Sequence, residues 1–286
     1  RLYIGNGTVA DGAPAVGNTE IITAGSSAFT TALQHTYKGY LGESTPITTA
    51  TQRSVATKLD DVISVKDFGA KGDDSTADVT AIQNAIDEVY RDTDKADKRS
   101  RRILFFPAGT YRINASITIP PHAHLVGEGP DKTVIRNSGA GAVAVTEDTN
   151  GNVYGSIGSA PTQIQVSNIT FKNTVAHPGL SIDNATKLYF NNCRFEGSYA
   201  QGGVDAANSK GVTVRSTTAL PCSQIVFNQC EFTKFARLVD LSHDVTNVRF
   251  HNCDFSESYY GALIGGTLDG TSNGLTVGPR DIQFSG

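Results

Sequence analysis

One eight-residue phrase occurs three times in the second half of this 286-residue chain, and it constrains the fold more than any other feature. The first copy reads Leu188-Tyr189-Phe190-Asn191-Asn192-Cys193-Arg194-Phe195, and later copies span 225–232 and 248–255. Partial copies begin at Ile169 and Ile282. Starts at 169, 188, 225, 248 and 282 give spacings of 19 to 37 residues. Such spacings are typical of solenoids, in which each repeat packs only on its neighbours.

Each copy of the phrase reads as strand, bend and strand. Leu188 and Phe190 alternate with polar residues, the pair Asn191-Asn192 interrupts the alternation, and Cys193 and Phe195 resume it. Stacked copies place like residues about 4.8 Å apart, close enough for one Asn amide to bond the next. We therefore predict a structural core ladder that contains Phe190, Phe227, Phe250, Cys193, Cys230 and Cys253.

The predicted fold class is all-β, with short strands wound into a parallel β-helix. Only 18% of residues are charged, and abundant Gly, Ser, Thr and Asn favour strands and tight turns. Coils of roughly 20–25 residues leave the longer spacings with an excess. We assign this excess to two protruding loops, Gly197–Pro221 and Tyr259–Pro279.

Several classes of site and partner are excluded by composition. The four cysteines form no Cys-x-x-Cys pair, so we expect free core thiols, no metal site and no cofactor. A net charge of −4 argues against nucleic-acid binding, which favours a basic face. The chain contains no run of 18 apolar residues, so we expect no membrane insertion.

An amphipathic helix is predicted upstream of the repeats, at about residues 76–91. Val79, Ile82, Ile86 and Val89 share one face at helical spacing, and Ser75 with Asp78 resembles a capping box. Because the first coil of a solenoid exposes unpaired strand edges, we expect this helix to cover the N-terminal end of the coils. Strand-like runs follow from Ile103 onward.

Four phrases in this region together resemble the opening of the pectate-lyase-like right-handed β-helix superfamily, which phage tailspikes and some polysaccharide-degrading enzymes share. They are Val65-Lys66-Asp67-Phe68-Gly69-Ala70-Lys71-Gly72-Asp73, Thr80-Ala81-Ile82-Gln83-Asn84-Ala85-Ile86, Phe106-Pro107-Ala108-Gly109-Thr110-Tyr111 and Leu125-Val126-Gly127-Glu128-Gly129. One departure is visible. The short Gly-rich turn expected after the helix is replaced by the charged stretch 92–102, read as a solvated loop or as a contact to a virion protein or glycan.

The N-terminal segment resembles the neck and tail-fibre motifs of phage tail proteins, at Leu2-Tyr3-Ile4-Gly5-Asn6-Gly7-Thr8 and Arg53-Ser54-Val55-Ala56-Thr57-Lys58-Leu59. The resemblance implies a virion-attachment and neck region at 1–64 and the start of the β-helix at 65–286. It also implies a homotrimer on the phage tail, extracellular, joined to a baseplate or tail protein and facing a host surface glycan. A chain without Met that stops within a strand-like run is expected to be part of a longer polypeptide.

The resemblance carries no catalytic motif into this sequence. A glycosidase needs two carboxylates about 5–9.5 Å apart. Asp183 and Asp240 follow apolar strand runs and are the catalytic candidates, chosen from a set that also holds Asp205, Glu231, Asp254 and Glu257. We find no acidic cluster at calcium-ligand spacing for a lyase mechanism.

Tyrosines in the predicted loops are candidates for carbohydrate binding. Tyr199, Tyr259 and Tyr260 present rings that stack on sugars, and a trimer contact would use the same residues. His251 occupies the Asn column of the bends and is read as structural. The outward column Arg194, Glu231 and Asp254 is read as opposite charges on a solvated face.

The sequence favours a phage tailspike or tail-fibre component for virion attachment and host polysaccharide recognition. Two alternatives stay open, a polysaccharide depolymerase (glycoside hydrolase or lyase) and a purely structural baseplate adaptor. Paired carboxylates in a groove, or cleavage of the host glycan, would distinguish the depolymerase from the other two.

Overall fold

The computed structural model describes residues 61–91, 102–148, 150–153, 158–216, 220, 222–265 and 278–286, and four short strands before them. The chain divides into two compact units, Arg1–Asp61 and Val62–Gly286. In the first unit, β1 (Tyr3–Ile4) pairs antiparallel with β2 (Thr19–Glu20), and β3 (Gln34–His35) with β4 (Arg53–Ser54). The remainder of the predicted attachment region and the charges Lys95, Lys98, Arg99 and Arg101 lie outside the described residues.

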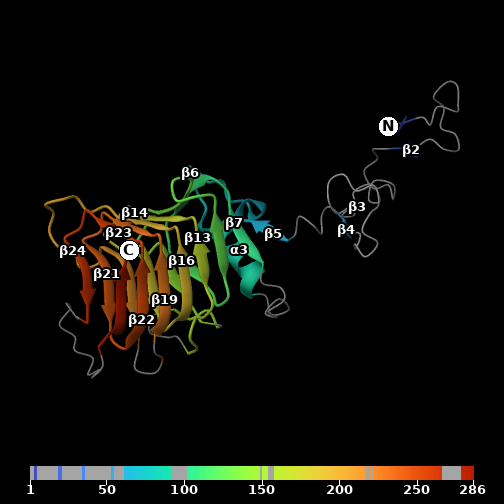
Figure 1. Cartoon of the computed structure of the whole chain (residues 1–286). Coiled ribbons are helices and arrows are strands. Elements are labelled where there is room, and N and C mark those ends of the chain that lie inside the picture. Colours follow the sequence, from blue (N-terminus) through green and yellow to red (C-terminus); the bar gives the residue numbers. More distant parts are fainter. Residues whose placement is uncertain are drawn as a thin grey trace. The chain divides into compact units, whose positions relative to one another are not determined.

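The second unit is a parallel β-helix, as predicted, with three sheets that run along it (Figure 1). Sheet 1 contains β5 (Val62–Ser64), β7 (Ile103–Phe106), β10 (His124–Gly127), β13 (Gln165–Ser167), β16 (Thr186–Asn191), β19 (Cys222–Asn228), β22 (Val245–His251) and β25 (Arg280–Ser285). Sheet 2 contains β6 (Asp73–Ala77), β8 (Gly109–Ile113), β11 (Thr133–Asn137), β14 (Thr170–Asn173), β17 (Arg194–Glu196), β20 (Glu231–Thr233) and β23 (Asp254–Ser256). Sheet 3 contains β9 (Ile117–Ile119), β12 (Ala144–Thr146), β15 (Leu180–Asp183), β18 (Lys210–Arg215), β21 (Arg237–Ser242) and β24 (Tyr260–Ile264).

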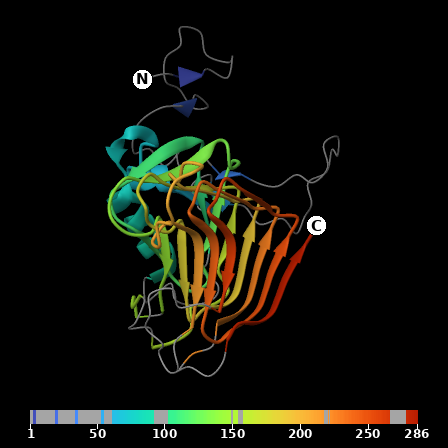
Figure 2. The ribbon, with the colours of Figure 1, turned by 90° about the vertical axis from the view of Figure 1, so that its left-hand side faces the viewer.

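Successive coils stack in register, so strands of one sheet lie side by side in chain order (Figure 2). Phe190 pairs with Phe227 and Phe227 with Phe250, and their rings stack with centroids 4.9 and 5.0 Å apart. A second column, from Phe171 to Phe255, stacks in sheet 2 and meets the first edge to face. Offset and edge-to-face rings are favourable beyond their buried area. The predicted Phe ladder is therefore confirmed.

The bend between sheets 1 and 2 carries the predicted amide contacts. Asn192 Nδ2 donates to Asn168 Oδ1 at 2.7 Å, and Asn228 Nδ2 donates to Asn191 Oδ1 at 2.6 Å. Asn192 has a φ of 50°, a left-handed conformation that Asn tolerates better than most residues. His251 occupies this amide column, where its Nδ1 lies 2.6 Å from Ser285 Oγ.

The cysteines are free thiols, as expected. Cys193 and Cys230 are buried and Cys253 is half-buried, one in each of three successive coils. Each Sγ donates to a carbonyl of the preceding coil, for example Cys230 Sγ to Phe190 O at 3.6 Å. Cys222 lies elsewhere, in β19, where burial raises the pKa of its thiol to about 12.

The predicted helix covers the N-terminal end of the coils, but its start differs from the prediction. α3 spans Val79–Ile86 and continues as a π-helical turn, η3 (Asp87–Arg91). Ser75 lies in β6, which pairs with β8, so the predicted capping box is wrong. The Asp78 carboxylate instead accepts from the backbone N–H groups of Lys71 and Gly72 at 2.7 and 3.0 Å. A 3₁₀ turn, η2 (Val65–Phe68), precedes β6.

Ile82, Ile86 and Val89 belong to the same buried core as the coils. The helix is therefore an integral part of the solenoid. Its predicted apolar face packs as expected, against β8 and β9. No helix among the described residues is long and apolar enough to cross a membrane.

Both predicted loops are shorter than expected because each contains a strand. β18 (Lys210–Arg215) lies inside the predicted loop Gly197–Pro221, and β24 (Tyr260–Ile264) lies inside Tyr259–Pro279. The spacing argument assumed that all residues beyond one short coil protrude. In fact they also complete sheet 3, and residues 266–277 lie outside the described part of the chain.

Candidate functional site

The outer face of sheet 3 carries most of the buried charges of the solenoid. Alternation sends Leu180 and Ile182 into the core and Ser181 and Asp183 outward. Two outward columns run across the sheet, one through Ser181, Thr213 and Asp240 and one through Asp183, Arg215 and Ser242. The structure thus brings both predicted acids, Asp183 and Asp240, onto one face.

Each of the two acids has its own basic partner. Arg215 Nε lies 2.8 Å from Asp183 Oδ1, and Lys210 Nζ lies 2.8 Å from Asp240 Oδ2. Two strands and two residues separate the acids, which places their Cα atoms about 12 Å apart. Burial raises the pKa of Asp183, and the Arg215 guanidinium opposes that shift. A catalytic role for this pair stays a prediction.

A nearer carboxylate, which sequence reasoning missed, is Glu147. Val145 pairs with Ser181, and continuing this register by two residues places Glu147 opposite Asp183 on the neighbouring strand. Asp183 N donates to Thr146 Oγ1 at 3.1 Å, which holds the two strands together at this point. Both acids are 1% exposed. The signal in the sequence was an acid directly after a short apolar strand, as at Asp183.

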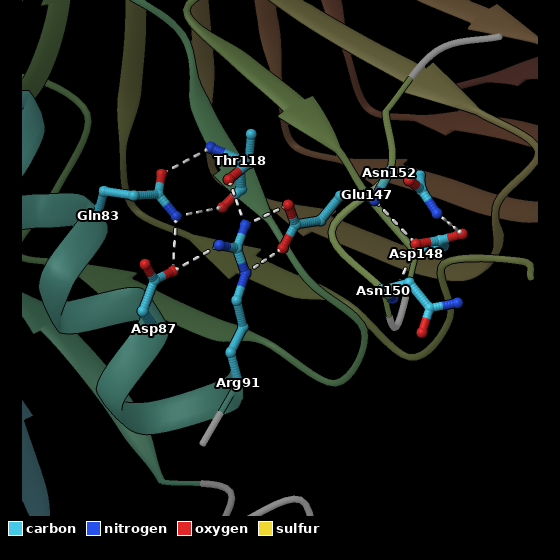
Figure 3. Close-up of polar contacts among 8 residues, drawn as sticks. All are labelled: Gln83, Asp87, Arg91, Thr118, Glu147, Asp148, Asn150 and Asn152. Carbon is cyan, nitrogen blue, oxygen red and sulfur yellow. Dashed lines mark hydrogen bonds and ion pairs between the residues drawn. The ribbon is translucent and has the colours of Figure 1, made fainter. Parts of the chain in front are cut away.

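Glu147 is held by the cap of the solenoid (Figure 3). Arg91, the last residue of η3, contacts both Glu147 carboxylate oxygens and donates from Nη2 to Thr118 Oγ1 at 2.6 Å. Asp87 accepts from Arg91 and from Gln83, whose side chain also bonds the backbone of Thr118. Burial raises the pKa of Glu147, and Arg91 opposes that shift.

Asp148, which follows Glu147, fixes a turn. Its carboxylate accepts from the backbone N–H groups of Asn150, Asn152 and Gly158 and from the Asn152 side chain at 2.8 to 3.1 Å. Burial alone would raise the pKa of Asp148, but the donors of Asn152 and Gly158 outweigh it and lower the pKa to about 2. This acid is therefore ionised and fully engaged at neutral pH.

The outer face of sheet 1 is different, because its side chains are open to solvent. A shallow depression of about 390 Å³ lies over three coils and is lined by His122, His124, Gln163, Gln165, Lys187 and Tyr189. Tyr189 is 48% exposed and lies at the floor of its column, in register with Gln165 and His124. Sequence reasoning quoted Tyr189 within the repeat but did not single it out.

The tyrosines predicted to bind carbohydrate lie apart from this depression. Tyr199 lies between β17 and β18 and donates to Gly203 O at 3.1 Å. Tyr259 and Tyr260 pack on each other edge to face at 4.7 Å, and Tyr260 begins β24 rather than lying in a loop. Their role in binding stays a prediction.

Sheet 2 carries alternating charges on its outer face. Arg194 pairs with Glu231 and Asp131, both at 2.6 Å, and Lys172 pairs with Glu196 at 2.9 Å. The predicted opposite-charge stacking of Arg194 and Glu231 is confirmed. Surface pairs of this kind add little stability.

Comparison with known proteins gives the family and the fold. The sequence profile of the family described as rhamnogalacturonase A/epimerase, pectate lyase-like, matches residues 62–263. The mannuronan C5-epimerase AlgE2 of Azotobacter vinelandii is 38% identical over 79 residues, 25% of this chain and 7% of that protein. A probable glucan endo-1,3-beta-glucosidase of Arthroderma benhamiae is 27% identical over 200 residues, 66% of this chain and 22% of that protein.

Two solved tailspikes share the fold. The tailspike protein gp49 of the Acinetobacter baumannii bacteriophage Fri1, a capsular polysaccharide depolymerase, has a TM-score of 0.55 at 14% identity, covering 82% of this chain and 41% of that one. The Dettilon tailspike protein has a TM-score of 0.51 at 15% identity, covering 69% of this chain and 33% of that one. The chain spans less than half the length of each of these relatives and structures. The match over 62–263 establishes that the chain belongs to the rhamnogalacturonase A/epimerase, pectate lyase-like family.

Proposed function

We propose that this chain is part of a phage tailspike whose β-helix recognises a polysaccharide of the host cell surface. The observation that carries the proposal is the unbroken register of the three sheets, which aligns outward side chains in straight columns. The columns of sheet 1 extend over eight strands, roughly 34 Å at the usual strand spacing. A linear polymer needs a long surface of this kind, with a similar set of groups at each step.

The family and the shared fold support the same function. The relatives are named for reactions on polysaccharides, and the Fri1 tailspike is described as a capsular polysaccharide depolymerase. In this proposal the protein is a homotrimer on the phage tail, outside the host cell, and residues 1–64 join it to a baseplate or tail protein. Closed cyclic symmetry would place three β-helices around one axis.

Recognition is preferred to cleavage because of the state of the two acids on sheet 3. Glu147 and Asp183 are each 1% exposed and each contacts an arginine. A glycosidase needs one protonated acid and one free carboxylate beside the scissile bond. Buried acids that are already paired with guanidinium groups instead have the arrangement of structural ion pairs.

A depolymerase is the second candidate, favoured by the place of the same two acids on neighbouring strands. Strands of one sheet lie about 4.8 Å apart, close to the separation of about 5–5.5 Å in retaining glycosidases. In this candidate function Glu147 and Asp183 replace the pair Asp183 and Asp240.

The two candidates are distinguished by one set of measurements on the purified chain. It is incubated with a panel of capsular and lipopolysaccharide glycans, and both retention of the glycan and release of reducing ends or unsaturated sugars are followed. We expect saturable binding to one glycan without cleavage. Cleavage that Glu147→Gln or Asp183→Asn abolishes would establish the depolymerase, and a folded chain that binds none of the glycans would favour the baseplate adaptor.

A further inference from the structure

We propose that the outer face of sheet 1, across β10, β13 and β16, is a binding site for an acidic sugar, a hexuronate unit of a polysaccharide. This site rests on the proposed function and deepens it. It lies on a different sheet from the acids Glu147 and Asp183. The six residues that line it are His122, His124, Gln163, Gln165, Lys187 and Tyr189.

The site consists of two parallel columns. His124, Gln165 and Tyr189 are in register in the sheet and point outward, since the residues between them and the next positions, such as Phe190, are buried. His122, Gln163 and Lys187 precede them by two residues in each coil, at the bend that leads into the sheet. The three coils span roughly 10 Å between outer strands, about the length of a disaccharide.

The side chains suit a sugar ring. Tyr189 offers a half-exposed aromatic face, on which the C–H face of a hexose packs. Gln163 and Gln165, both exposed, each provide two N–H donors and a carbonyl acceptor, which match the alternating hydroxyl groups of a sugar. An apolar platform with a few polar groups around it is the usual composition of a small-ligand site.

The charge of the site favours an acidic sugar. Lys187 is exposed and brings an ammonium group to the bend column, and no carboxylate is among the six lining residues. Burial lowers the pKa of His124, so its imidazole is neutral and offers one donor and one acceptor. An ammonium group binds a sugar carboxylate through a charge-assisted hydrogen bond.

The backbone of the bend column gives an independent argument. His122, Gln163 and Lys187 have φ values of 68°, 57° and 61°, in the left-handed region that disfavours side chains other than Asn, Asp and Gly. Further along the same column the chain places Asn247 and Asp281, at 52° and 53°. Strained residues of this kind mark positions that a ligand uses. The long side chains of Gln163 and Lys187 are thus kept where Asn would be less strained.

Isothermal titration calorimetry of the purified chain tests the site, with oligomers of mannuronate, galacturonate and glucuronate and with their carboxyl-reduced counterparts. Tyr189→Ala is expected to weaken binding of the preferred acidic oligomer about tenfold, because the ring platform is lost. Lys187→Asn keeps the left-handed bend but removes the charge. It is expected to weaken the acidic oligomer about fivefold and leave the reduced one nearly unchanged.

Two matched variants serve as controls. Tyr259→Ala removes a tyrosine that is 49% exposed, against 48% for Tyr189, and Gln224→Asn alters the next position of the bend column. Both are expected to bind within about twofold of the unmodified chain.

Oligouronate or host-glycan binding that Tyr189→Ala and Lys187→Asn leave unchanged would overturn this site while the proposed function stands. Equal affinity for acidic and carboxyl-reduced oligomers would overturn the acidic preference. A change of oligomeric state in Tyr189→Ala, with glycan binding intact, would show that sheet 1 is a subunit contact instead. A chain that binds neither these oligomers nor any host glycan would contradict the site and the proposed function together.

Discussion

Replacing one ring in the middle of the Phe ladder tests how much the stacking of coils contributes to stability. Phe227 is fully buried, stacks on Phe190 and Phe250, and meets Phe195 and Phe232 edge to face. Phe→Ala in a core costs about 3–5 kcal/mol, and each aromatic pair contributes about 0.5–1.5 kcal/mol beyond area. With four ring neighbours, Phe227→Ala is expected at the upper end, about 4–5 kcal/mol.

Phe284→Ala is the matched control, at the last rung of the same ladder. Phe284 is 46% exposed and has two ring neighbours, Phe250 at 4.7 Å and Phe255 at 5.7 Å. Because about half of its area is already in water, we expect a cost of roughly 1–2 kcal/mol. Urea unfolding is followed by far-UV circular dichroism and by tyrosine fluorescence, since the chain has no Trp. Equal costs for the two variants would refute the ladder as the main source of stability.

Three further predictions concern the bends, the acids and the thiols. Asn192→Ala is expected to cost about 1–2 kcal/mol in urea unfolding, because it loses the bond to Asn168 and strains a left-handed residue; Asn192→Gly, which loses only the bond, should cost less, and the reverse order would contradict the amide ladder. The lowered pKa of Asp148 contributes stability that is present above pH 3.8 and is lost as the pH falls toward about 2. Asp148→Asn should therefore destabilise the chain by about 2 kcal/mol at pH 7 and hardly at all near pH 2, and a cost that does not depend on pH would show that the carboxylate charge is unimportant. Four thiols should react with a disulfide reagent in denaturant without prior reduction, whereas Cys193, Cys222 and Cys230 should react slowly in the native chain because they are buried, and rapid native reaction would place them at the surface.

The repeats made the ladders predictable from sequence. Positions such as Phe190, Cys193 and Asn192 recur at fixed places in a phrase, and parallel stacking in register is the one arrangement that buries the apolar members together. The same argument was too simple for lengths. It treated all residues beyond a short coil as loop, and so missed that β18 and β24 complete sheet 3.

The helix start was predicted wrongly because a local motif competed with a long-range pairing. Ser75 followed by Asp78 satisfies the spacing of a capping box, but β6 pairs with β8, far along the chain. Asp78 then turns its carboxylate back to the N–H groups of Lys71 and Gly72. A sequence reading of caps does not contain this pairing.

The candidate sites were harder to predict than the fold. Glu147 lies outside the repeated phrase, and its partner Arg91 is 56 positions away along the chain. Tyr189 lies inside the phrase, but its ring becomes part of a site only when Gln165 and His124 stack beside it. Such groupings depend on register between coils of unequal length, which the spacing of the copies leaves open.

The most direct test of the account is a crystal structure of the chain soaked with the acidic oligosaccharide that it binds best. We predict a sugar ring on the face of Tyr189, its carboxylate at Lys187 Nζ, and the Phe and Asn ladders in unbroken register behind it. A sugar seated between Glu147 and Asp183 on sheet 3, with sheet 1 empty, would contradict the account and identify the chain as an enzyme.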